Sequence, residues 1–191
     1  MNPSHDRFEP LSRREISERT LEVLNRGGWG NPDVLLVEVD GGRAVVKDFA
    51  PRKRWVRRFL APRLIAREEE AYRRLEGVPA IPRLLGRLDG NALMIEYRPG
   101  VFLSRSLSSR LPPGFLGELE ATIHEMHRRG VVHLDLRHRS NILAGEDGRP
   151  IVIDFASALR FDATTAWGRA LVVLFGWVDR RAMEKWRVRL G

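Results

Sequence analysis

The chain has 191 residues, enough for one domain or two small lobes, and its hydrophobic share of 43% and charged share of 30% are typical of a folded protein. It contains no cysteine, which excludes disulfides, thiolate metal sites and a cysteine nucleophile. The formal charge of +8 favours anionic partners, including nucleotides, anionic membrane surfaces and nucleic acid, without choosing among them.

The segments that could direct the chain to a membrane are weak. Residues 1–10 are polar and lack the apolar stretch of a secretory signal. The longest apolar run, 166–178, is shorter than the ~20 residues that a spanning helix needs. We therefore expect a cytoplasmic protein in which 166–178 forms a buried helix.

The first predicted element is a helix of about three turns that begins after Ser12. Ser12 and Glu15 form a capping-box pattern. The side chains that follow recur at helical spacing, namely Ile16, Thr20, Val23 and Leu24. The glycine-rich segment 27–32 would end this helix.

A β-hairpin follows, and after it a second helix. Residues 34–39 and 43–49 are rich in β-branched side chains, and Asp40-Gly41-Gly42 between them suits a tight turn. Residues 64–76 have helical periodicity, with one stripe formed by Leu64, Glu68, Ala71 and Leu75. Glu68 should therefore face inward, while Glu69 and Glu70 should be solvated.

The second half predicts another strand, a helix and a group of short strands. Residues 92–97 read as a strand, and Pro112-Pro113 opens a helix that Gly130 ends. The inward side chains of this helix are Leu116, Leu119, Ile123 and Met126. Strands at 131–135, 141–144 and 150–155 would then place Asp135, Asn141 and Asp154 at strand ends around one small hairpin.

These polar residues supply what phosphoryl transfer from ATP requires: oxygen ligands for a divalent metal and a carboxylate for the acceptor hydroxyl. The motif His133-Leu134-Asp135-Leu136, followed by Asn141 and by Asp154-Phe155-Ala156, resembles the catalytic and metal-binding loops of the protein kinase superfamily. Upstream, Ala44-Val45-Val46-Lys47 resembles the Val-Ala-Ile-Lys strand, and Ile95-Glu96-Tyr97-Arg98 resembles the hinge. The resemblance covers about residues 27–160, in order.

The resemblance implies a role for each matching residue. Asp135 would orient or deprotonate the acceptor hydroxyl, with Arg137 near the transferring phosphate, and Asn141 and Asp154 would hold Mg²⁺ or Mn²⁺. Lys47 would contact the α- and β-phosphates of ATP and pair with Glu68. The hinge residues Glu96 and Arg98 would lie at the adenine, and His133 would support the loop.

Three departures from the family pattern matter. Asn141 lies six residues after Asp135 instead of five, which implies a one-residue bulge and makes Ser140 the rival ligand. Gly28 and Gly30 form a degenerate phosphate loop, whose third glycine position falls at Asp33. Ala156 replaces the glycine that follows Asp-Phe in many protein kinases.

The residues after Asp154 carry no Ala-Pro-Glu motif and are too few for the large helical subdomain of ordinary protein kinases. The chain thus resembles minimal bacterial kinases, of the RIO type and of the lipopolysaccharide core (Kdo or heptose) type. We expect an α+β, two-lobed protein-kinase-like fold with a reduced C-terminal lobe. Residues 1–98 would form the N-terminal helix and nucleotide-binding lobe, and residues 99–191 the catalytic lobe.

The expected function is transfer of the ATP γ-phosphoryl group to a hydroxyl. A lipid-linked sugar or another non-peptide acceptor is favoured over a protein serine or threonine. A catalytically inactive nucleotide-binding scaffold stays open. So does a metallohydrolase built on His133, Asp135 and His138 with His124 or His127, although the apolar stripe of their helix accounts for His124 and His127 as helix-face residues.

A basic segment has two readings. Residues 52–74 contain nine Lys and Arg residues, and Trp55, Val56, Phe59 and Leu60 form an apolar stripe among them. The stripe could lie on an anionic membrane surface, which would make the protein peripheral to the inner membrane, or it could fold against the small lobe. Nucleic acid is not favoured, because no recognition motif is present. A second apolar set is expected in the core, namely Trp167, Leu171, Leu174 and Phe175.

Overall fold

The computed structural model describes residues 11–190, so the expectation about a signal in residues 1–10 lies outside the described part. The chain divides into two compact units. The first contains residues up to Glu69 together with Leu84–Tyr97, and the second contains Glu70–Arg83 and the residues from Arg98 onward. Both contain helices and antiparallel sheets, as the predicted α+β class requires. The two-lobed kinase arrangement and its division at residue 98 stay predictions.

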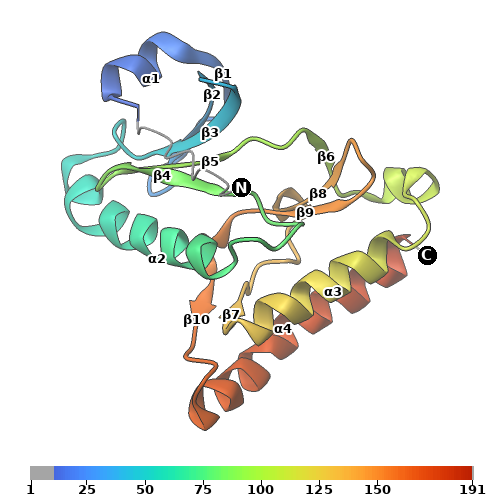
Figure 1. The fold of residues 1–191 in the computed structure, drawn as a ribbon. Coiled ribbons are helices and arrows are strands. Elements are labelled where there is room, and N and C mark those ends of the chain that lie inside the picture. Colours follow the sequence, from blue (N-terminus) through green and yellow to red (C-terminus); the bar gives the residue numbers. More distant parts are fainter. Residues whose placement is uncertain (1–10, 191) are drawn as a thin grey trace, which may run out of the picture. The chain divides into compact units, whose positions relative to one another are not determined.

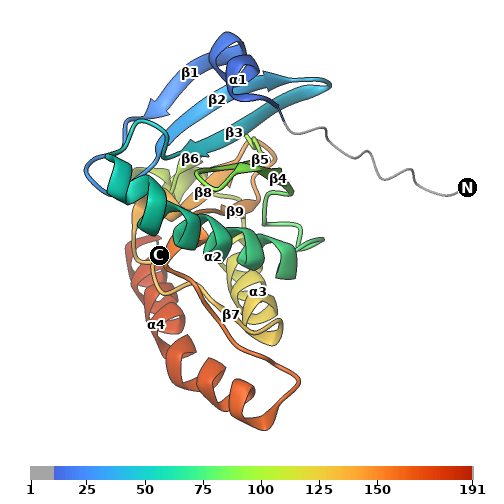
Figure 2. The same ribbon diagram turned by 90° about the vertical axis from the view of Figure 1, so that its left-hand side faces the viewer.

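The first unit is a five-stranded antiparallel sheet with one short helix and the start of a longer one (Figures 1 and 2). The strand order is β1-β2-β3-β5-β4. The elements are α1 (Arg13–Arg19), β1 (Thr20–Asn25), β2 (Asp33–Val39), β3 (Gly42–Asp48), α2 (Ala61–Arg74), β4 (Leu84–Asp89) and β5 (Ala92–Glu96). The predicted hairpin is confirmed as β2 and β3, whose turn places Gly41 at φ 87°.

The first predicted helix is only half right. Its capping box is present, since Glu15 N donates to Ser12 Oγ and Ser12 N donates to Glu15 Oε2 at 2.8 Å. The helix ends at Arg19, however, and the chain continues as β1, which pairs with β2. Thr20 and Val23 are β-branched, and a neighbouring strand offers their backbone a ladder of hydrogen bonds that a marginal helix cannot match.

The core of this unit lies between α1 and one face of the sheet. Ile16 contributes the helix side, and the sheet side comes from Val37, Val39, Ala44, Val46, Ala92 and Met94. Arg13 fixes the helix at its edge, with ion pairs to Asp48 at 2.5 Å and Asp89 at 2.8 Å. One face of β3 is thereby used for packing, so its alternate residues point to the other face.

Helix α2 continues from a π-helical segment, Val56–Leu60, and passes from the first unit into the second. Glu68 is buried as predicted. Glu69 is not solvated: its side chain is only 14% exposed and pairs with Arg87 at 3.4 Å. Glu70 is the solvated member of the three, and it pairs with Arg74 one turn later.

The second unit combines two long helices with two small sheets. The elements are β6 (Gly100–Phe102), α3 (Phe115–Arg128), β7 (Val131–Val132), β8 (Ile142–Gly145), β9 (Pro150–Val152), β10 (Leu159–Arg160) and α4 (Ala166–Leu190). The sheets have the orders β6-β8-β9 and β10-β7. Helices α3 and α4 lie side by side (Figures 1 and 2) and run antiparallel, since His127 contacts Asp179 while Glu120 contacts Arg187.

The short predicted strands end earlier than expected. The strand predicted at 131–135 stops at Val132, and the one predicted at 150–155 stops at Val152. Leu134 and Asp154 both have φ 68°, which is outside the strand region. Hydrogen bonds to the Asp179 side chain hold the backbone at His133 and Leu134 in place of a strand ladder.

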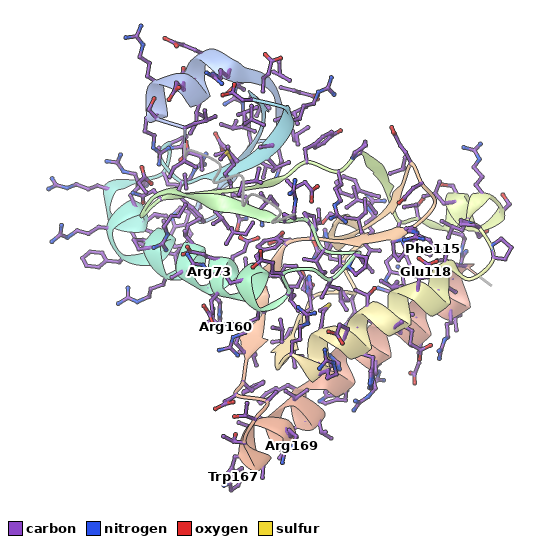
Figure 3. The ribbon with its side chains drawn as sticks, in the orientation of Figure 1. Arg73, Phe115, Glu118, Arg160, Trp167 and Arg169 are labelled. Carbon is purple, nitrogen blue, oxygen red and sulfur yellow. The ribbon has the colours of Figure 1, made fainter. Side chains whose placement is uncertain are left out.

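The predicted core role of the first part of α4 is wrong for two of its four residues, Trp167 and Leu174, whereas Leu171 and Phe175 are half-buried and Phe175 stacks on Phe161. Trp167 is 79% exposed and points outward at the start of the helix (Figure 3), and Leu174 is exposed as well. The buried side of α4 is formed instead by Gly168, Val172, Gly176, Asp179, Ala182, Met183 and Trp186. Within residues 11–190, no helix is both long enough and apolar enough to cross a membrane.

Candidate active site

The first unit contains a buried ion pair between β3 and α2. Lys47 Nζ lies 2.5 Å from Glu68 Oε1, and both side chains are buried. Val46, beside Lys47 on β3, belongs to the core under α1, so the strand alternation turns Lys47 to the opposite face. Each buried charge would be costly alone, and the pair offsets that cost. Lys47 and Glu68 therefore come together as the resemblance implies.

The segment between β1 and β2 contains Gly28 and Gly30. A side chain at Gly28 would meet no atom within 4 Å, and one at Gly30 would make only an ordinary contact with Leu60. Gly27 is the residue that needs to be glycine, because a Cβ there would lie 2.2 Å from Asn31 O. The steric requirement therefore falls one residue before the predicted phosphate loop.

Asp33 and Arg52 hold this segment. Asp33 occupies the expected third glycine position, is buried, accepts a hydrogen bond from Gly27 N at 2.9 Å and pairs with Arg52. Arg52 also donates to the carbonyls of Gly27 at 2.5 Å and Gly28 at 2.9 Å. The Asp33–Arg52 ion pair therefore fixes the backbone at Gly27 and Gly28, and a role of this loop in binding phosphate stays a prediction.

The predicted hinge residues lie at the end of β5. Glu96 is its last residue and pairs with Ala44 on β3, and Tyr97 N donates to Arg43 O at 3.3 Å. Arg98 belongs to the second unit, where its guanidinium donates to Pro79 O. Binding of adenine by this segment stays a prediction.

In the second unit, Asp179 of α4 holds the loop that carries Asp135. Its two carboxylate oxygens accept from His133 N and Leu134 N, each at 2.8 Å, and from His127 Nε2 at 2.9 Å. Leu134 has φ 68°, a conformation that costs a non-glycine residue about 1–3 kcal/mol. The buried, charge-assisted hydrogen bonds of Asp179 offset this strain.

Asp135 and Asn141 are in direct contact. Asn141 Nδ2 donates to Asp135 Oδ2 and to Asp135 O, both at 2.9 Å, and the Asn141 side chain is buried whereas Asp135 is exposed. The loop from Asp135 to Asn141 has one residue more than the spacing expected from the resemblance. Two successive turns accommodate it: His138 N donates to Asp135 O, and Asn141 N donates to His138 O. The expected bulge is therefore replaced by a 3-10 turn at Arg139–Asn141.

Asp154 lies next to Asn141 along the backbone pairing. Ile153 N donates to Asn141 O at 3.0 Å, so Asp154 follows the residue that pairs with Asn141. Asp154 has φ 68° and caps the turn that follows by accepting from Ala156 N. Phe155 is fully buried against the rings of His133 and Tyr72, at centroid distances of 4.9 and 5.0 Å. Phe155 thereby anchors the backbone that presents Asp154.

His133 has the supporting position that the resemblance implies. It is fully buried, and its Nε2 lies 3.0 Å from Ile153 O, which ties the loop to the strand end before Asp154. Asp135 N donates to its Nδ1 at 3.3 Å. Both ring nitrogens are thus engaged with the backbone of the two acidic segments.

Arg137 lies on the exposed side of the same loop. Lys185 of α4 donates to Arg137 O at 3.4 Å, and Trp186 Nε1 donates to Leu136 O at 2.9 Å. The pKa of Lys185 is lowered by desolvation and by the positive charges of Arg189 and Arg137. Arg137, Lys185 and Arg189 thus place positive charges near one another, which suits an anionic ligand.

The donor set suits a hard divalent cation. Asn141 donates through Nδ2, which directs its Oδ1 as an acceptor, and Asp154 supplies a carboxylate from the adjacent strand end. Ser140 Oγ lies 2.5 Å from His138 Nδ1 and donates to Asn141 Oδ1 at 3.2 Å. Mg²⁺ is commonly held by one or two protein oxygens together with substrate phosphates. Asn141 and Asp154 fit that pattern, and Ser140 remains the neighbouring alternative.

Three of the four histidines of the metallohydrolase alternative have other partners. His127 contacts Asp179, His133 contacts Ile153 O and His138 contacts Ser140. Among residues 11–190, no group of three or more His, Cys, Asp or Glu side chains is arranged to hold a metal ion.

Asp179 is the residue of this site that the sequence interpretation missed. The signal was present, because Val172, Gly176, Asp179, Met183 and Trp186 recur at helical spacing and form the buried stripe of α4. A carboxylate on a buried stripe requires hydrogen-bond donors, so the spacing indicates that Asp179 has partners. The sequence does not show that these partners are His127, His133 N and Leu134 N.

No protein-family model matches the chain. The chain is 26% identical over 165 residues to a protein of Synechocystis sp. named serine/threonine-protein kinase C. This alignment covers 76% of the chain but only 30% of the relative, so the chain spans less than a third of that protein's length. The similarity supports a kinase-like phosphotransferase in general terms.

Proposed function

We propose that the protein is an ATP-dependent phosphotransferase that moves the γ-phosphoryl group to a hydroxyl acceptor. The observation that carries this proposal is the Asp135–Asn141 contact beside Asp154, on a loop that Asp179 holds. A carboxylate, an amide oxygen and a second carboxylate in this order are the groups that kinase chemistry uses. The similarity to a serine/threonine-protein kinase agrees with it.

In the proposed reaction, Asp135 receives the acceptor hydroxyl. Asn141 engages Oδ2 of the exposed carboxylate, so Oδ1 can accept the hydroxyl hydrogen. The acceptor oxygen forms a bond to the γ-phosphorus as the bond between that phosphorus and the bridging oxygen of ATP breaks. ADP leaves, and the hydroxyl proton goes to Asp135.

Other residues would hold the nucleotide. Asn141 Oδ1 and Asp154 would hold Mg²⁺ or Mn²⁺, which when bound neutralises phosphate charge. Lys47, fixed by Glu68, would contact the α- and β-phosphates, and Arg137 would add positive charge near the transferred group. Backbone groups around Glu96 and Arg98 would bind adenine, and the loop with Gly28 and Gly30 would cover the phosphates.

The acceptor that we favour is a sugar hydroxyl on a lipid-linked glycan or another non-peptide molecule. The basic segment with its aromatic residues Trp55 and Phe59 supports it, as does the resemblance to the lipopolysaccharide core kinases, and such an acceptor would place the protein in the cytoplasm at the inner membrane. The second candidate is a protein serine or threonine, which the name of the Synechocystis relative favours.

An assay with radiolabelled ATP tests activity and acceptor together. The wild-type chain and Asp135→Ala are incubated with a lysate separated into protein, lipid-glycan and small-molecule pools. We expect label in the lipid-glycan pool with the wild type and none with Asp135→Ala, which should still bind nucleotide. Label in the protein pool would favour the second acceptor. Tight ATP binding without transfer to any pool would identify a nucleotide-binding scaffold and contradict the proposal.

A further inference from the structure

Three aromatic side chains of the first unit are exposed, and two of them, which come from separate segments, are in contact. Trp29 comes from the β1–β2 connection and is 70% exposed, whereas Trp55 and Phe59, at the start of the helical segment before α2, are 41% and 55% exposed. The rings of Trp29 and Trp55 are in contact, with centroids 4.9 Å apart. We call Trp29, Trp55 and Phe59 the aromatic patch.

The residues beside Trp55 and Phe59 differ in burial and contacts. Val56 takes the inward position of the same turn and is fully buried. Arg63 donates to Phe59 O at 2.6 Å, and the guanidinium of Arg58 lies over the Phe59 ring at 5.9 Å. Of the apolar stripe in this segment, the core thus receives Val56, while both aromatic residues stay exposed. Val56 is buried and Leu60 is half-buried, as the packing reading expects, whereas Trp55 and Phe59 are exposed, as the membrane reading expects.

The segment that carries Trp55 and Phe59 is also strongly basic. Five basic residues of the same segment are exposed: Lys53, Arg54, Arg57, Arg58 and Arg63. No acidic residue occurs in the sequence between Asp48 and Glu68. Arg52 does not belong to this group, because it is engaged with Asp33 and the carbonyls of the loop. The aromatic patch and these five residues together form a surface whose charged side chains are all basic.

We propose that this surface docks the protein on an anionic phospholipid membrane. Tryptophan and phenylalanine favour the boundary between headgroups and acyl chains, and neighbouring arginines bind lipid phosphates. Single-stranded nucleic acid is the alternative occupant, and no recognition motif in the sequence supports it. The proposal concerns a surface of the first unit and does not depend on the phosphotransferase reaction.

Co-sedimentation of the full chain with vesicles tests it. We expect binding to phosphatidylcholine/phosphatidylglycerol vesicles, weak binding to phosphatidylcholine alone, and weaker binding at ~1 M salt than at ~0.1 M. The variant with Trp29, Trp55 and Phe59 changed to Ser, and the variant with Arg54, Arg57 and Arg58 changed to Gln, should each bind at least about tenfold more weakly. Because all six side chains are exposed, both variants should keep the wild-type melting temperature.

The matched control changes Trp167 and Trp177 to Ser, since these are exposed aromatic residues on α4. This variant should keep wild-type vesicle binding. An equal loss in the control would mean that binding is not specific to the aromatic patch and would overturn the proposal. So would patch variants that still bind vesicles but lose binding to a short single-stranded RNA.

Discussion

Asp179 joins three parts of the second unit through one carboxylate: the end of α3, the loop before Asp135, and α4 itself. It accepts hydrogen bonds from two consecutive backbone N–H groups, those of His133 and Leu134, and Leu134 has a positive φ. Orphaned N–H groups in a buried loop are costly, so this side chain decides whether the loop keeps its shape.

The substitution Asp179→Asn should therefore destabilise the fold. Asparagine has one acceptor oxygen, and its NH₂ group would face a second N–H donor. We expect the free energy of unfolding to fall by about 2–3 kcal/mol in urea denaturation. Asp40→Asn is the control, because the Asp40 side chain is 98% exposed, and its effect should stay within about 0.5 kcal/mol. An Asp179→Asn protein as stable as the control would show that the loop does not depend on this carboxylate.

Glu125 gives the second unit a dependence on acid pH. Its pKa is lowered from the usual 4.5 to about 2 by hydrogen bonds from Arg128 and Arg129. A carboxylate whose pKa is lower in the folded state stabilises the fold above the unfolded pKa, and this stability is lost as pH falls toward the folded pKa. Because Glu125 and its two arginine partners are partly solvated, we expect them to contribute only about 1 kcal/mol to the free energy of unfolding.

Urea denaturation of the wild type and Glu125→Gln between pH ~5 and ~2 measures this contribution. The difference in unfolding free energy between them should shrink as the pH falls. Glu146→Gln, in an exposed turn, should keep the wild-type pH dependence. A constant difference between wild type and Glu125→Gln would contradict the shifted pKa.

Helices α3 and α4 approach closely at Gly176. A Cβ at this position would lie 2.9 Å from Cε1 of His127, whose ring is fixed by Asp179. Gly176→Ala should therefore displace His127 and cost about 1–3 kcal/mol of unfolding free energy. Gly117→Ala on α3 is the matched control, because nothing lies within 4 Å of the added methyl group, and it should be neutral or stabilising by up to about 1 kcal/mol. Equal effects in thermal or urea unfolding would contradict the close approach.

Local patterns were sufficient for some of these elements. The β2–β3 hairpin depends on alternation and a glycine turn, and the burial of Glu68 depends on the period of one helix, so both were predicted correctly. The end of α1 at Arg19 and the exposed face of α4 were not, because each depends on a partner distant in sequence: β2 in the first case and α3 in the second. Periodicity indicates that a helix has an apolar side, but α4 has apolar residues on two sides, and its contacts with α3 and with the loop at His133–Leu136 decide between them.

The candidate residues were identified from sequence as an ordered set, and the structure adds their local geometry within each unit. Lys47 and Glu68 are paired in the first unit, and Asp135 and Asn141 are in contact in the second, beside the strand end with Asp154. The hydrogen-bond partners of Asp33, Arg52 and Asp179 could not be predicted from sequence. Each side chain binds backbone groups that only the folded chain brings near.

The most direct test of the phosphotransferase proposal compares the wild type with Asp154→Asn. The quantity measured is the metal-dependent rate of transfer of the ATP γ-phosphoryl group. We expect the wild type to transfer label only with Mg²⁺ or Mn²⁺, and Asp154→Asn to lose at least about 100-fold of that rate while unfolding like the wild type. Asp147→Asn, in the exposed β8–β9 turn, should keep full activity. Unchanged transfer by Asp154→Asn would contradict the proposed site.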